Sequence, residues 1–88
     1  MSSVKQLKKD INDALGALIE DIYGVELDNP KVDAKKTDSI IDAAINLFDE
    51  LIGEINLAKN KGKGAFKGIE EKFEKGLVKL RGDLAKLN

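Results

Sequence analysis

The chain has 88 residues, and its 15 basic and 16 acidic side chains nearly cancel, so it is a single small domain without the strong positive charge typical of nucleic-acid binders. It contains no His and no Cys, which excludes the usual general base, the commonest metal ligand, thiol nucleophiles and disulfides. We therefore expect a non-enzymatic protein without a cofactor. No apolar run has the length of a signal peptide or a membrane span, which predicts a soluble, cytoplasmic protein that does not insert into membranes.

The first predicted element is an amphipathic helix from about Ser3 to Tyr23. Ser3 and Gln6 match the pattern of a capping box, and Gly24 is expected to end the helix. Residues 24–33 contain the only proline of the chain and are expected to form a loop. The apolar residues of the helix follow one another at steps of three or four, which places them on one face: Val4, Leu7, Ile11, Leu15, Leu18, Ile19 and Ile22.

A second helix is predicted over residues 33–60 and a third over residues 64–87. The N-cap of the second is either Asp33 or Thr37, and Asp33 is favoured because Ala34 and Thr37 then continue the apolar stripe. That stripe is predicted to contain Ile41, Ala44, Ile45, Phe48, Leu51, Ile52 and Ile55. The apolar stripe of the third helix is predicted to contain Phe66, Ile69, Phe73, Leu77, Leu80, Leu84 and Leu87.

Three amphipathic helices of similar length joined by short connections predict an all-α, up-down-up three-helix bundle made of one domain, residues 1–88. The competing architecture is a two-helix hairpin that completes its core by dimerising. Gly76 lies on the core side of the third helix, where it is expected to let a neighbouring backbone approach closely.

The segment KNKGKGAFKG, residues 59–68, resembles glycine-rich phosphate loops only superficially. A helix rather than a strand precedes it, and no Gly-Lys-Ser/Thr sequence closes it, so we interpret it as the connector between two helices. In an up-down-up bundle its lysines share one end of the molecule with those that open the first helix. We call this set the lysine pole; it consists of Lys5, Lys8, Lys9, Lys59, Lys61, Lys63 and Lys67. The opposite end of the bundle collects acidic residues.

Three apolar residues fall off the predicted core stripes and are candidates for contact with a protein partner. Leu57 lies almost opposite the core face of the second helix, Val78 lies on the outer side of the third, and Leu47 flanks the stripe of the second. The acidic clusters near residues 49–54 and 70–74 fall mostly on outer faces and lack the His residues of di-metal bundles, so no metal site is expected.

These features favour a small non-enzymatic protein that acts through protein–protein contacts, as an adaptor, an inhibitor or immunity-type factor, or an oligomeric scaffold. The partner is another protein or a second copy of the chain, and the sequence leaves open whether a homodimer forms. The alternative is a weak, non-specific binder of anions or nucleic acid that uses the lysine pole, since lysine supplies charge without a geometry that distinguishes one sequence from another.

Overall fold

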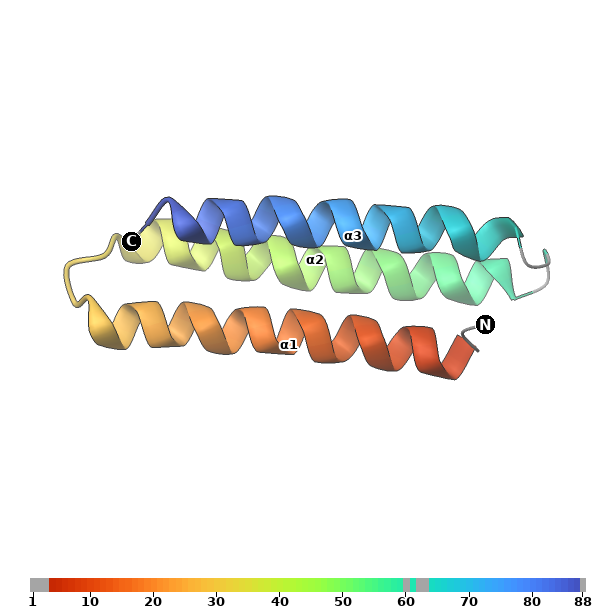
Figure 1. The fold of residues 1–88 in the computed structure, drawn as a ribbon, viewed down its shortest axis with the longest axis horizontal. Coiled ribbons are helices and arrows are strands. Elements are labelled where there is room, and N and C mark those ends of the chain that lie inside the picture. The colour runs from red at the N-terminus through yellow and green to blue at the C-terminus, as the bar shows by residue number, and fades with distance from the viewer. Residues whose placement is uncertain (1–3, 60, 62–63, 88) are drawn as a thin grey trace.

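The computed structural model describes residues 4–59, 61 and 64–87. Three helices make up the fold: α1 (Val4–Asp28), α2 (Ala34–Ala58) and α3 (Gly64–Ala85). Each runs antiparallel to the one before it, and the molecule is a narrow rod of 48 × 17 × 16 Å (Figure 1). The predicted all-α, three-helix bundle is therefore confirmed. The capping residue Ser3 and the end of the predicted second helix at residue 60 lie outside the described residues.

The core runs along the inside of all three helices. Its members are Leu7, Ile11, Leu15, Leu18, Ile22, Ile40, Ala44, Leu51, Ile55, Ala58, Ile69, Leu80 and Leu84. The buried residues of α1 belong to the predicted stripe, because steps of three and four keep them on one face. Thr37 is the only buried polar residue among those described, and its hydroxyl lies within hydrogen-bond distance of two acceptors.

Helix α1 extends five residues beyond its predicted end at Tyr23. Gly24 does not end it, because the next turn gains tertiary contacts. Val25 packs against the core, and Glu26 Oε2 accepts a hydrogen bond from Thr37 Oγ1 of α2 at 2.8 Å. The helix ends before Pro30, whose ring disfavours helical geometry at the residue preceding it. The connection to α2 is consequently shorter than the predicted loop.

Helix α2 begins at the favoured cap: the side chain of Asp33 accepts a hydrogen bond from the backbone N–H of Lys35 at 2.9 Å. Its core face is rotated from the predicted stripe. Ile40 is buried, whereas Ile45 is 46% exposed and Ala34 is exposed. The cause is the position of α2, which packs along both α1 and α3, so that its buried residues are those that face the space between the two.

The contact between α2 and α3 differs from the one expected at Gly76. The space beside this glycine is filled by the side chain of Leu47, not by a neighbouring backbone. Nearby on the surface, Lys72 Nζ donates hydrogen bonds to Glu50 and to Glu54 of α2, the latter at 2.7 Å. These hydrogen bonds favour the charged amine and raise the pKa of Lys72 above its ordinary value. Packing and charge together hold α3 on this side of α2.

Candidate binding surface between α1 and α2

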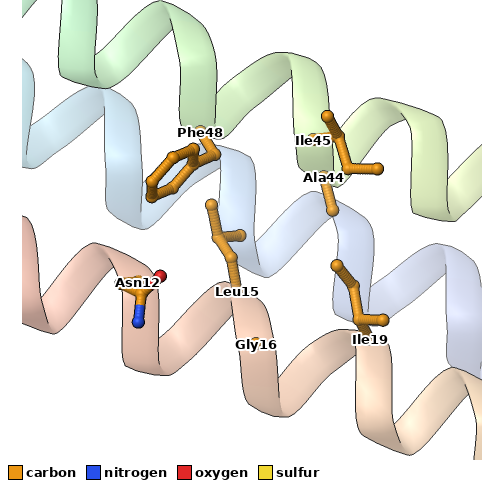
Figure 2. A pocket seen from close by; sticks show the side chains of 7 residues that line it. All are labelled: Asn12, Leu15, Gly16, Ile19, Ala44, Ile45 and Phe48. Atoms are coloured by element: carbon orange, nitrogen blue, oxygen red, sulfur yellow. The ribbon is translucent and has the colours of Figure 1, made fainter.

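An apolar hollow of about 200 Å³ lies between α1 and α2 (Figure 2). Leu15 and Ile19 project into it from α1, and Ile45 and Phe48 project from α2. Gly16 of α1 also lines it; this residue is exposed, and an added Cβ atom there would meet nothing within 4 Å. The complete lining is Asn12, Leu15, Gly16, Ile19, Ala44, Ile45 and Phe48.

The apolar surface continues along both helices beyond the hollow. On α2 the residues Ile41, Ile45, Phe48 and Ile52 recur at steps of three and four, which keeps them within about 60° of one another around the helix. All four are only partly buried, or exposed. On α1 the same side carries Ile19, which is half-buried, and Tyr23, which is 53% exposed. We call this surface the α1–α2 face; it consists of Gly16, Ile19, Tyr23, Ile41, Ile45, Phe48 and Ile52.

The third helix does not cover this surface. Gly76 of α3 lies beside Leu47 of α2, and Lys72 of α3 donates a hydrogen bond to Glu54 of α2. Both contacts are on the other side of α2, and Figure 2 shows α3 behind the two helices that form the hollow. The α1–α2 face therefore brings together large, incompletely buried apolar side chains of two helices, Ile19, Ile45 and Phe48, on a side of the bundle that α3 does not cover.

The lysine pole is assembled at one end of the rod, where α1 starts, α2 ends and α3 starts (Figure 1). Lys8 Nζ donates a hydrogen bond to Asn56 Oδ1 at 3.0 Å, and Lys9 pairs with Asp13 at 3.1 Å. Partial burial, followed by repulsion from the neighbouring Lys59, lowers the pKa of Lys8. Lys5, Lys59, Lys61 and Lys67 are exposed, and Lys63 lies outside the described residues.

The three contact candidates taken from the sequence do not form one patch. Leu57 is 70% exposed and Val78 is 72% exposed, as their positions off the core stripes predict, but they belong to different helices. Because Gly76 of α3 lies beside Leu47 of α2, Leu57 is roughly 18 Å further along the rod than Val78 at 1.5 Å per residue. Leu47 is half-buried and packs against the core.

The α1–α2 face was not distinguished from the core by its sequence pattern. Ile41, Ile45, Phe48 and Ile52 were placed together with the buried residues, because a stripe of apolar residues this wide gives no indication of which edge is covered. The sequence feature that indicates the face is the width of the apolar stripe, since the apolar residues of α2 occupy more of the helix circumference than contact with two neighbouring helices requires.

Other kinds of site find no support among the described residues. None of the described helices combines the length and the apolar character required to cross a membrane. In the same part of the chain, no three acidic side chains come close enough together to hold a metal ion. Comparison of the chain with protein-family models, with curated proteins and with solved structures gave no significant match.

Proposed function

We propose that this protein is a non-enzymatic binding module of the cytoplasm that holds an amphipathic helix of a protein partner on its α1–α2 face. The observation that carries the proposal is the partly exposed row Ile41, Ile45, Phe48 and Ile52, which adjoins an apolar hollow on α1. Adaptors, inhibitors and oligomeric scaffolds all work by this kind of contact. The proposal concerns the mode of binding that they share.

The chemistry of the face suits a helix better than a small polar ligand. A helix in a groove is anchored by apolar side chains at steps of three and four, and the rows on α1 and α2 have the same spacing. Gly16 leaves room at the centre of the groove for one large side chain of the incoming helix. Burying a single Ile or Phe side chain is worth about 1.5–3 kcal/mol, so a few such anchors support a stable complex.

The proposal is tested by titrating the ¹⁵N-labelled protein with a panel of synthetic amphipathic helical peptides of unrelated sequence. We expect amide shifts that concentrate at Gly16, Ile19 and Ile45 with at least part of the panel. The variant Ile45→Lys should abolish these shifts, whereas the matched variant Leu57→Lys, also an exposed position of α2, should retain them. An unresponsive face, or shifts centred on Leu57 and Val78, would contradict the proposal.

A second candidate function is weak binding of polyanions at the lysine pole. The observation that favours it is the gathering of the exposed Lys5, Lys59 and Lys67 at one end of the rod, where burial and then the charge of Lys59 lower the pKa of Lys8. Binding of a polyphosphate should fall steeply with added salt, and Lys8→Gln with Lys59→Gln should weaken it. Binding that persists unchanged in that double variant would place the anion elsewhere.

A further inference from the structure

The proposed function leaves the occupant of the α1–α2 face unspecified, and the charges around that face identify one. We propose that the occupant is the same face of a second copy of this chain, turned end for end about a two-fold axis that passes near Gly16 and Phe48. This inference rests on the proposed function, because it names the partner for the same surface.

The two ends of the face carry opposite charge. At one end lie Lys5 and Lys8 of α1 and Lys59, the C-cap of α2. At the other end lie Glu26 of α1 and Asp38 of α2, whereas Asp42 and Asp49 lie at the edge of the face on either side of its centre. A copy turned end for end brings the lysines of each chain to the acids of the other, at both ends of the interface. Such complementarity fixes the orientation of a complex.

The alternative two-fold arrangement keeps the two copies parallel. It brings Lys5, Lys8 and Lys59 of one copy against the same residues of the other, and it also brings the acidic ends together. Like charges placed opposite each other in an interface cost several kcal/mol. The antiparallel arrangement is therefore the one that the charge distribution selects.

The charged ends and the apolar centre of the face also have the same midpoint. Two hydrogen bonds set the level of α1 against α2: Lys8 to Asn56 at 3.0 Å and Thr37 to Glu26 at 2.8 Å. The point midway between Lys8 and Glu26 on α1 falls next to Gly16, and at that level α2 has its apolar pair Ile45 and Phe48.

A two-fold axis at this level gives a consistent set of apolar contacts. Helix α1 then faces α1 of the other copy, and α2 faces α2. On α2, Ile45 of each copy meets Phe48 of the other, and Ile41 of each meets Ile52 of the other. On α1, the two Gly16 residues lie near the axis, where the lack of side chains lets the helices approach closely.

The size of the face is also adequate for a stable dimer. Each of the two helices has 25 residues, which at 1.5 Å per residue gives a length of about 37 Å. With the 17 Å width of the molecule the flat projection is roughly 600 Å², and the accessible surface of side chains exceeds such a projection. Stable interfaces cover about 800 Å² on each partner.

Sedimentation equilibrium tests whether the dimer forms and which surface forms it. We expect the wild-type chain to dimerise with a dissociation constant between micromolar and millimolar, which Ile45→Lys raises by at least about tenfold because it places a charge in the apolar centre. Leu57→Lys, the matched control on the outer side of α2, should leave the constant unchanged. A wild-type monomer up to millimolar concentration, or a dimer insensitive to Ile45→Lys, would overturn the inference.

The orientation is measured by electron–electron double resonance between nitroxide labels. The chain has no native Cys, so Asn46→Cys and Leu57→Cys each give one labelled position per copy, both on the exposed outer side of α2. The proposed axis, midway between Ile45 and Phe48, lies half a residue from Asn46 and ten and a half residues from Leu57. In the antiparallel dimer the Leu57 labels are therefore separated along the rod by about 30 Å more than the Asn46 labels. Equal separations at the two sites would mean a parallel dimer and would overturn the inference.

Different results would contradict the proposed dimer and the proposed function. If the chain is a monomer and still binds amphipathic peptides at Gly16 and Ile45, the proposed function survives and the self-association is wrong. If it is a monomer and no peptide binds, both are wrong. If it is a dimer, the peptides should compete with dimerisation, and Ile45→Lys should abolish both kinds of binding.

Discussion

The side chain of Leu47 fills the space that a side chain on Gly76 would need. An ideal Cβ atom on Gly76 would lie 2.6 Å from Leu47 Cδ2 and 3.2 Å from Leu47 Cδ1. The absence of a side chain on Gly76 thus leaves the space into which Leu47 of α2 packs, and this contact fixes the rotation of α3 about α2. The same rotation leaves the α1–α2 face uncovered, because α3 occupies only one side of α2.

This contact predicts that Gly76→Ala gains little or no stability. An alanine in a helix interior is worth about 0.5–1 kcal/mol over glycine, but here the leucine must move to make room. The matched control is Gly53→Ala in α2, where an added Cβ meets nothing within 4 Å and the full gain is expected. Urea unfolding measures both. The difference between them should disappear in a Leu47→Ala background; if it persists there, another contact limits Gly76.

The hydroxyl group of Thr37 is expected to stabilise the fold in addition to the packing of its methyl group. It is fully buried, and its hydroxyl donates either to Glu26 Oε2 at 2.8 Å or to the carbonyl oxygen of Ala34 at 3.0 Å. The nearly isosteric change Thr37→Val should cost about 1–2 kcal/mol in the free energy of unfolding, because it leaves the Glu26 carboxylate without this donor. In a Glu26→Ala background the cost should be smaller. An equal cost in both backgrounds would assign the effect to Ala34 or to packing.

The pairing of Lys72 predicts a pH-dependent contribution to stability. The hydrogen bonds that Lys72 donates to Glu50 and Glu54 raise the pKa of Lys72 in the folded state above the unfolded value of 10.5. The stabilisation that follows from this shift is therefore fully present below about pH 10.5 and is lost as the pH rises through the raised folded value. The free energy of unfolding of wild type minus that of Lys72→Met should accordingly be positive near neutral pH and decrease at strongly alkaline pH.

The stability of the wild type must be compared with that of Lys72→Met, because the pKa of Lys8 is shifted in the opposite direction and also makes the stability depend on pH. The lowered pKa of Lys8 makes the folded protein gain stability as the pH rises towards 10.5. Lys75→Met provides the control, since within the described chain Lys75 is an exposed residue of α3 with no ion pair. A wild-type advantage over Lys72→Met that stays constant across the alkaline range would contradict the role given to Lys72.

The antiparallel dimer predicts a rescue by double charge reversal. Lys59→Glu should weaken the dimer, because α2 faces α2 of the other copy and the new acid then lies near Asp38. Asp38→Lys should weaken it as well, for the converse reason. The chain that carries both changes should recover much of the wild-type affinity, and added salt should reduce the effect of each change. Analytical ultracentrifugation at two salt concentrations measures this. Failure of the double variant to recover would count against the end-for-end arrangement.

The sequence predicts most of this fold because apolar spacing dominates it. The stripe of α1 and the N-cap at Asp33 are where the sequence pattern places them, since both depend on local chemistry. The end of α1 was wrong because a local stop signal, Gly24, is overridden by contacts of Val25 and Glu26 with other parts of the chain. Such contacts are absent from any local pattern.

The candidate surface was less predictable for the same reason. Leu57 and Val78 are exposed as their helical positions require, but exposure of single residues does not make a surface. The α1–α2 face exists because Gly76 and Lys72 of α3 contact Leu47 and Glu54 on the far side of α2. Contacts between helices decide which side of α2 is covered by α3, and the apolar pattern of α2 alone is compatible with either side.

Dilution of the ¹⁵N-labelled chain tests most directly the central proposal that two copies of this chain meet at their α1–α2 faces. We predict that amide shifts between micromolar and millimolar concentration concentrate at Gly16, Ile19, Ile45 and Phe48, while Leu57 and Val78 remain unchanged. Concentration-independent spectra, or shifts that cluster at Leu57 and Val78 instead, would contradict it.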